Sequence, residues 1–331
     1  MWSEEITRNI RTTAESLLRE GKVDLIIGYQ AGTTPLRTTP AFIRSAEQAP
    51  SLVWNPFCEN NLSVYLPKRK ERIGLMAKGC DGRSAVVALQ EKQIDRDRLT
   101  IIALPCSGII DRKKLASAFD IDKVKGFSLE QDSLVLDVER GEPVKVSLGE
   151  FLHASCQTCT ERTSSIADIS IGQEGQGESG NEANESMLRG QDEFAEIRAF
   201  EALSSQERWD YFTALAQKCI RCYACRSACP LCYCQECIVD QTQPQWFGKT
   251  TAQEDVLVYH IMRAFHAAGR CVDCGACSRA CPMGIDLRIL NKKLQKDVKE
   301  LYHYTPGLNP DVAPAMGDYK PDDPQECITE K

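Results

Sequence analysis

Two cysteine motifs with the same spacing lie in the second half of the chain and limit what it can fold into. The first has the pattern C-x2-C-x2-C-x3-C-P and consists of Cys219, Cys222, Cys225 and Cys229. The second repeats that pattern and consists of Cys271, Cys274, Cys277 and Cys281. Two-cluster ferredoxins show this spacing, and the last thiolate of each motif ligates the cluster of the other motif. The sequence therefore predicts a mainly helical, ferredoxin-like dicluster domain.

This exchange of ligands assigns eight thiolates to two [4Fe–4S] clusters. The first cluster takes Cys219, Cys222, Cys225 and Cys281. The second takes Cys271, Cys274, Cys277 and Cys229. A zinc module is the alternative, but zinc needs neither a third cysteine at this spacing nor a proline after the last one.

The remaining cysteines and the charge restrict the class of protein further. The chain has 331 residues and 17 cysteines, and its N-terminal segment lacks the apolar stretch of a secretory signal. We therefore expect a cytoplasmic protein without a disulfide framework. There are 40 basic and 47 acidic residues, which argues against nucleic acid as a partner. No apolar run is long enough to span a membrane.

Three further cysteines, Cys232, Cys234 and Cys237, lie between the two motifs. Three thiols within six residues suggest another metal site, for which Cys58 is a candidate fourth ligand. The alternative is that these thiols bind no metal. Cys327 lies in a polar tail and is expected to be inert.

The first half of the chain has the pattern of a mixed-sheet α/β domain. The N-terminal segment predicts an amphipathic helix that ends at Gly21. Short apolar runs at 23–28, 73–77 and 99–104 predict strands, and a helical stretch at 83–93 between the last two predicts parallel pairing. Two more runs, at 134–138 and 144–148, predict a hairpin.

Composition divides the chain into parts. Residues 172–190 contain almost no aliphatic side chain, which predicts a flexible linker. We expect an α/β domain at 1–171, a helical ferredoxin-type domain at 191–304 and an extended tail at 305–331. Helices are expected from a capping box at Ser204 to about Lys218, and over about 252–268.

Four cysteines of the first domain occupy informative positions. Cys80 and Cys106 follow two predicted parallel strands, where α/β sheets bind cofactors. Cys156 and Cys159 form a C-x2-C pair. These four thiols could hold a third cluster, while the alternative is a nucleophile at Cys106 and a core thiol at Cys80.

Residues 20–170 resemble the coenzyme F420 hydrogenase/dehydrogenase beta-subunit family. The resemblance rests on the two strand-end cysteines and on the C-x2-C pair followed by A-D-I-x-x-G, within residues 156–172. The dicluster part, with its C-I-R-C-Y-A-C-R-x-A-C-P-x-C-Y-C-x-x-C run, resembles the beta subunits of F420-type formate dehydrogenases. The resemblance implies FAD and one [4Fe–4S] cluster in the first domain, with Cys80, Cys106, Cys156 and Cys159 as the ligands.

Candidate contacts for FAD come from turns in the first domain. A loop that follows a strand can receive a phosphate or the edge of a ring. The alternative is that these are ordinary turn residues, and no G-x-G-x-x-G fingerprint is present. The candidates are Gly28, Gly32, Thr33, Thr34, Asn60, Asn61, Lys78, Gly79 and Gly82.

Taken together, the motifs predict an FAD- and iron–sulfur-dependent oxidoreductase subunit that transfers electrons. It would connect a two-electron carrier to a catalytic partner of the formate dehydrogenase, hydrogenase or heterodisulfide-reductase-like type. One alternative is a flavin-free electron-transfer adaptor that only docks and wires partner subunits. Another is a zinc-dependent scaffold. Apart from the alternative interpretation of Cys106, no residue pattern indicates an acid–base or nucleophilic catalytic group.

Overall fold

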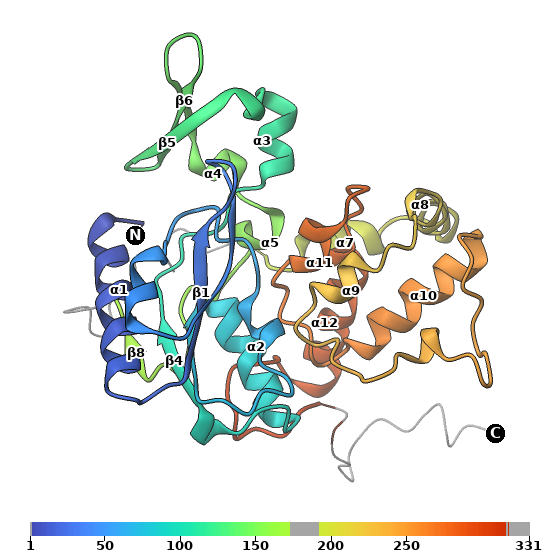
Figure 1. The fold of residues 1–331 in the computed structure, drawn as a ribbon. Coiled ribbons are helices and arrows are strands. Elements are labelled where there is room, and N and C mark those ends of the chain that lie inside the picture. The colour runs from blue at the N-terminus through green and yellow to red at the C-terminus, as the bar shows by residue number, and fades with distance from the viewer. Residues whose placement is uncertain (1, 173–191, 316, 318–331) are drawn as a thin grey trace.

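The structure, a computed structural model, describes residues 2–172, 192–315 and 317 (Figure 1). The predicted linker lies outside these residues except for Gly172, as do Cys327 and most of the predicted tail. An α/β region comes first in the chain, and a helical region follows it. Within the described residues, no helix is long and apolar enough to cross a membrane.

The α/β region is built on a five-stranded mixed sheet with the order β2-β1-β3-β4-β8. Strands β1, β3, β4 and β8 are parallel, and β2 pairs with β1 in the antiparallel direction. Their bounds are β1 Leu25–Ala31, β2 Thr38–Ile43, β3 Ile73–Ala77, β4 Leu99–Ala103 and β8 Ile169–Ser170. The three predicted strands and their parallel pairing are confirmed.

Helices cover this sheet, and Figure 1 shows α1 and α2 on opposite sides of it. Helix α1 (Glu4–Arg19) starts at Ser3, whose hydroxyl accepts a hydrogen bond from Ile6 N at 3.2 Å. Its buried residues recur at helical spacing, as the sequence predicts. Helix α2 (Gly79–Gln90) connects β3 to β4, and residues on both its faces are buried.

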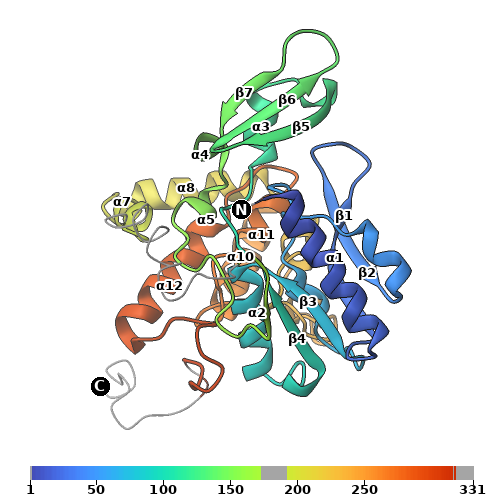
Figure 2. The ribbon, with the colours of Figure 1, turned by 90° about the vertical axis from the view of Figure 1, so that its left-hand side faces the viewer.

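A separate three-stranded antiparallel sheet extends from this region, as Figure 2 shows. It contains β5 (Val124–Glu130), β6 (Ser133–Val138) and β7 (Val144–Ser147). The predicted hairpin is the β6–β7 pair, whereas β5 was not predicted. Short helices flank the sheet at α3 Arg112–Ala118, α4 Leu148–Phe151 and α5 Ala154–Gln157.

The second region is helical, as predicted. The long helices α8, α10 and α12 pack around the two cysteine motifs, whose own short helices α9 and α11 contact each other. Ser204 forms the predicted capping box with Glu207 at the start of α8. The bounds are α7 Ala195–Glu201, α8 Ser205–Lys218, α9 Ala224–Ser227, α10 Gln253–His266, α11 Ala276–Ala280 and α12 Arg288–Tyr302.

Five 3-10 helices complete the described elements. They are η1 Ala46–Ser51, η2 Leu62–Tyr65, η3 Arg96–Arg98, η4 Ile121–Lys123 and η5 Ile238–Asp240.

Arginine and lysine side chains join the two regions across their contact. Arg270 forms an ion pair with Glu91, Arg279 Nη2 donates to the carbonyl of Glu59 at 2.7 Å, and Lys113 Nζ donates to the carbonyl of Ser278 at 3.2 Å. These contacts hold the second cysteine motif against the α/β region.

The segment after α12 returns to the first region. Arg83 Nη2 donates to the carbonyl of Pro306 at 2.8 Å, and Gln90 Nε2 donates to the carbonyl of Val312 at 2.7 Å. The start of the predicted tail therefore packs along α2.

Candidate metal centres

Four cysteines of the α/β region line one cavity of about 170 Å³. Cys80 lies in the first turn of α2, directly after β3, and Cys106 follows the neighbouring parallel strand β4. The carboxyl ends of neighbouring parallel strands meet at one edge of a sheet. Cys156 and Cys159 come from the other side of the cavity, at α5 and just after it. The structure thus brings together the four thiols that the sequence proposes as ligands.

Close backbone packing holds the Cys159 loop against α2. A Cβ atom on Gly79 would lie 2.0 Å from the carbonyl oxygen of Glu161, so only glycine permits this approach. In the same way, a Cβ on Gly82 would lie 2.2 Å from Ser164 Oγ. Both glycines therefore allow the loop at 161–164 to approach α2, and Gly79 itself lines the cavity.

Burial favours the protonated form of three of these thiols unless a cation replaces the proton. It raises the pKa of Cys106 to about 12, and it also raises the pKa values of Cys80 and Cys159. A buried metal cluster reverses this preference because it supplies positive charge to the thiolates.

The first ferredoxin-type set also surrounds a single cavity. Cys219, Cys222, Cys225 and Cys281 line it together. The fourth thiol comes from the second motif, which is the arrangement that the exchange of ligands requires. Cys222 is exposed, so this set reaches the protein surface.

The second ferredoxin-type set is buried at the boundary between the regions. Cys229, Cys271 and Cys274 pack around Leu231, Val272 and Val87 of α2. Burial raises the pKa of Cys274 to about 12, and the nearby thiols of Cys229 and Cys277 add to that rise. Cys229 of the first motif therefore lies with the second motif.

The two motifs share their backbone conformation as well as their spacing. Arg221 and Asp273 occupy equivalent positions and both have a φ of +52°. Tyr223 and Gly275 are also equivalent, with φ of +62° and +70°. Left-handed conformations are unfavourable for non-glycine residues, so their recurrence shows that each loop is held in one defined shape.

Buried arginine groups without partners face the thiol sets. Arg221 Nε and Nη2, Arg162 Nη1, and Arg279 Nε and Nη1 are buried and have no hydrogen-bond partner among the described residues. Arg221 lines the first ferredoxin-type cavity, while Arg162 and Arg279 line the cavity of the α/β region. Unpaired buried donors are costly, and an anionic cluster with its thiolates would satisfy them. The residues present therefore fit [4Fe–4S] clusters at these sites.

The three thiol sets are contiguous. Cys274 of the second set also lines the cavity of the α/β region, and its neighbour there is Arg279. The second set in turn approaches the first, because the charges of Cys277 and Cys281 both contribute to the raised pKa of Cys225. Twelve thiols thus form a continuous series from the edge of the sheet to the exposed Cys222.

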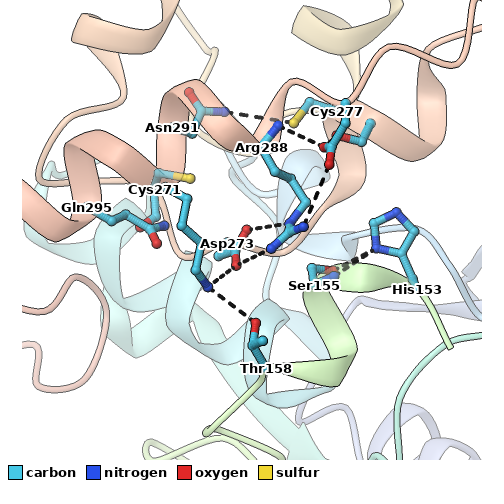
Figure 3. A network of polar contacts seen from close by, with 12 residues as sticks. His153, Ser155, Thr158, Cys271, Asp273, Cys277, Arg288, Asn291 and Gln295 are labelled. Atoms are coloured by element: carbon cyan, nitrogen blue, oxygen red, sulfur yellow. Dashed lines mark hydrogen bonds and ion pairs between the residues drawn. The ribbon is translucent and has the colours of Figure 1, made fainter. Parts of the chain in front are cut away.

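A buried ion network fixes the loop of the second motif (Figure 3). Arg288 is 2% exposed and binds Asp273 with Nε–Oδ1 and Nη2–Oδ2 distances of 2.9 and 3.1 Å. Lys292 Nζ binds the same carboxylate at 2.6 Å, and Arg288 also reaches Glu196 at 2.9 Å. Despite its burial, the pKa of Asp273 is lowered by Arg288 and Lys292. No local sequence pattern indicates these residues, because the carboxylate and its cations meet only when α12 packs on the loop.

A second group that sequence analysis did not identify is His260 of α10. Its Nε2 lies 3.3 Å from Cys219 Sγ, while its buried Nδ1 has no hydrogen-bond partner within the described chain. Burial, and then the charges of Arg263 and Arg221, lower the pKa of His260 to about 4. The imidazole is therefore neutral at pH 7, and we assign its proton to Nε2, where it can be donated to the thiolate.

The structure separates Cys58 from the three cysteines between the motifs. Cys58 is fully buried in the core of the α/β region, where its thiol receives a hydrogen bond from Asn55 N at 3.4 Å. Cys232, Cys234 and Cys237 line a different cavity in the helical region, together with Cys229. The expectation that Cys58 completes their ligand set is therefore wrong.

The candidate FAD contacts of the first loop do not form a cofactor site. A Cβ on Gly28 would lie 2.3 Å from Met76 Sδ, so the space beside it is filled by the core. Gly32 N donates to the carbonyl of Arg37 at 2.9 Å and closes the β1–β2 hairpin, and Thr33 and Thr34 in that turn are exposed. This loop connects two antiparallel strands, and it lacks the helix N-terminus that would bind a phosphate.

The other candidates lie around α2, near the cysteine cavity. Asn60 accepts a hydrogen bond at its carbonyl from Lys78 Nζ, and Asn61 Nδ2 donates to Ser84 Oγ at 2.9 Å. Lys78 and Gly79 line the cavity of about 170 Å³, whereas cofactor pockets typically measure about 300–1,000 Å³. The residues nominated for FAD therefore do not fit that group in this structure.

Comparisons with known proteins agree with the division seen in the structure. Residues 70–192 match the family described as the C terminus of the coenzyme F420 hydrogenase/dehydrogenase beta subunit. Residues 215–285 match a 4Fe-4S dicluster domain. The family resemblance stated from the sequence is thereby confirmed.

Two relatives align with most of the chain. The F420-dependent formate dehydrogenase subunit beta of Methanocaldococcus jannaschii is 24% identical, over 90% of this chain and 91% of its own length. The F420-dependent formate dehydrogenase 1 subunit beta of Methanococcus maripaludis is 24% identical, over 91% and 90%. A chain of the xenon-derivatised F420-reducing [NiFe] hydrogenase complex from Methanosarcina barkeri is 20% identical with a TM-score of 0.39. This match covers 50% of the present chain and 65% of the hydrogenase chain.

Proposed function

We propose that this chain is the electron-transfer beta subunit of an oxidoreductase complex related to F420-dependent formate dehydrogenases. Three [4Fe–4S] clusters would be held by the sets that begin at Cys80, Cys271 and Cys219. The clusters supply one-electron carriers, while the chain supplies their spacing, burial and hydrogen bonds.

The contiguity of the twelve thiols is the observation that supports this proposal most strongly. The cavity at the edge of the sheet contains Cys274 of the second set, and the second set leads on to the first. One end of this series lies at the edge of the sheet where the parallel strands end, which is where α/β sheets bind cofactors. The other end lies at the surface, where Cys222 is exposed. That arrangement suits conduction between a carrier and a partner subunit.

The partner is proposed from the relatives. Both curated relatives are beta subunits of F420-dependent formate dehydrogenases, so a formate-oxidising catalytic subunit is the partner that we expect. A hydrogenase-type or heterodisulfide-reductase-like partner would exchange electrons through the same series of clusters. The carrier at the sheet edge would then be coenzyme F420 or another two-electron acceptor.

FAD is part of the family expectation, but no step of this proposal passes through it. The nominated contacts of the first loop lie in core packing or in a hairpin turn, and the cavity that Lys78 and Gly79 line is smaller than a typical cofactor pocket. These observations favour the second candidate function, a flavin-free adaptor that wires partner subunits. Flavin absorbance after acid release of the clusters distinguishes the two functions.

Iron analysis of anaerobically purified chain tests the proposal. The three sets are expected to hold about twelve iron atoms. Cys80→Ala should remove about four of these and leave the ferredoxin-type signals in the electron paramagnetic resonance spectrum. Cys58→Ala, at the buried thiol of the sheet core, is the matched control and should retain all iron.

Activity with the partner provides the functional readout. Reconstituted with a formate dehydrogenase catalytic subunit and supplied with free flavin as the one-electron to two-electron converter, the chain should support transfer from formate to F420, and Cys80→Ala should abolish that transfer. In the complex with this variant, the catalytic subunit should still reduce a viologen dye with electrons from formate. Unimpaired F420 reduction by Cys80→Ala would contradict the assigned path.

A further inference from the structure

We propose that Cys232, Cys234 and Cys237 hold a fourth iron–sulfur cluster in a separate cavity of the helical region. The cavity measures about 450 Å³, and its lining includes these three thiols and Cys229 of the second set. This site lies outside the path of the proposed function, which uses only the other twelve thiols.

The chain order and the local backbone bring the three thiols to one place. Cys232 N donates to the carbonyl of Cys229 at 3.1 Å, so the chain turns as it leaves the first motif. Cys237 precedes η5, and its carbonyl accepts from Asp240 N at 2.7 Å. The C-x-C-x2-C run is thereby folded as a loop around the cavity and does not extend away from it.

The loop is anchored to both regions. Arg270 Nη2 donates to the carbonyl of Leu231 at 3.2 Å and to Tyr233 Oη at 2.7 Å, and its guanidinium also pairs with Glu91 of α2. Leu231 packs against Val87. A loop of thiols held in this way is preorganised for a ligand, because its position does not depend on the cavity being filled.

The cavity has the same chemical signature as the predicted cluster sites. The cavity of the α/β region and that of the first ferredoxin-type set each combine thiols with an arginine whose buried N–H group has no partner among the described residues. Here that arginine is Arg263, whose buried Nε has no hydrogen-bond partner within the described residues. Arg226 adds a second positive charge and hydrogen-bonds the Cys237 thiol. These cations offset the net negative charge that the thiolate ligands give to a bound iron–sulfur cluster.

The geometry favours a cluster over a single metal ion. A tetrahedral zinc site needs its sulfurs about 4 Å apart, given a Zn–S distance of about 2.3 Å. Among the residues that the structure describes, no group of three or more histidine, cysteine, aspartate or glutamate side chains is placed to hold one ion.

Three thiolates bind three of the four irons of a [4Fe–4S] cluster, so the fourth iron needs another ligand. Asp240 and His266 line the same cavity. The Asp240 carboxylate is paired with Arg226 at 2.5 Å, whereas His266, the last residue of α10, offers an imidazole nitrogen. We assign the fourth position to His266.

The test compares three variants with the unaltered full-length chain, all purified anaerobically after cluster reconstitution. Cys232→Ser/Cys234→Ser/Cys237→Ser should lose about four iron atoms and four sulfides relative to the unaltered chain. It should also lose one component of the reduced electron paramagnetic resonance spectrum. Cys58→Ala should lose none. His266→Ala should change the shape of that same component and leave the others unaltered.

The outcomes separate this site from the proposed function. Equal iron in the triple variant and the unaltered chain overturns the fourth cluster, whatever the total is. Loss of one zinc per chain without loss of iron also overturns it. The fourth cluster is tested by the difference in iron content between the triple variant and the unaltered chain. The other three clusters are tested by the total iron content, so either proposal can be contradicted while the other stands. Retained signals of those sets show that the variant has folded.

Discussion

The hydrogen bond from His260 to Cys219 should raise the reduction potential of the cluster at the first ferredoxin-type set. Reduction adds negative charge to the cluster and its thiolates, and an N–H donor stabilises that charge. The imidazole is 3% exposed and its Nε2 lies 3.3 Å from the sulfur, so water cannot easily replace it. Replacing His260 with leucine removes the donor and should lower the potential.

The magnitude follows from the energy of such bonds. A hydrogen bond to a charged group contributes about 1.5–3 kcal/mol, and part of that is already present in the oxidised cluster. A difference of about 1 kcal/mol between the two oxidation states corresponds to about 40 mV for a one-electron couple. His260→Leu should therefore lower this potential by about 40 mV. His260→Gln, which keeps an N–H donor, should lower it by less than half as much.

Redox titration followed by electron paramagnetic resonance measures these shifts, with the signal of the second set as the internal reference. The pH dependence is a further check. The pKa of His260 is lowered to about 4, so the side chain stays neutral in both oxidation states between pH 6 and 8. The potential should then be independent of pH in that range. An unchanged or raised potential in His260→Leu, or a fall of about 59 mV per pH unit in the unaltered chain, would refute this reasoning.

Three further changes test other parts of the structure. Gly79→Ala should displace the loop at Glu161, since its Cβ would lie 2.0 Å from a carbonyl oxygen, and iron analysis should show about four atoms fewer. Gly149→Ala, where the new Cβ would be 3.8 Å from Ser147 Oγ, should retain them. Asp273→Ala leaves Arg288 and Lys292 buried without their shared carboxylate, and urea unfolding should show a loss of about 3–5 kcal/mol. In contrast, Glu130→Ala breaks only an exposed ion pair with Lys145 and should lower the free energy of unfolding by at most about 1 kcal/mol. An equal loss in Asp273→Ala and Glu130→Ala would contradict the stabilising role of the buried network. Arg83→Ala removes two hydrogen bonds to the carbonyl of Pro306, so amide hydrogen exchange over 304–312 should accelerate, and an unchanged rate would show that the bonds from Gln90 and Ser165 hold the segment without Arg83.

The elements that the sequence predicted well are those whose signal is local. Strand β3 is buried on both faces, and its continuous apolar run marks a parallel strand without reference to the rest of the chain. The capping box at Ser204 is likewise complete within four residues. Strand β2 was missed because Pro40 weakens its pattern, although proline is acceptable on this edge strand. Strand β5 carries only a weak alternation and becomes recognisable through its pairing with β6.

The candidate site divides in the same way. Cysteine spacing alone identified the two ferredoxin-type sets as candidate ligands. Cysteines separated by two residues lie in one tight loop and can bind the same cluster. Spacing could not determine that Cys58 lies in a distant core, or that His260 touches Cys219, since both depend on contacts between segments far apart in the chain. Only the tertiary structure placed Cys274 in the cavity of Cys80 and gathered Arg288 and Lys292 around Asp273. Chain spacing sets which thiols can share a loop, whereas the packing of helices on a sheet decides which loops meet and which charges are buried between them.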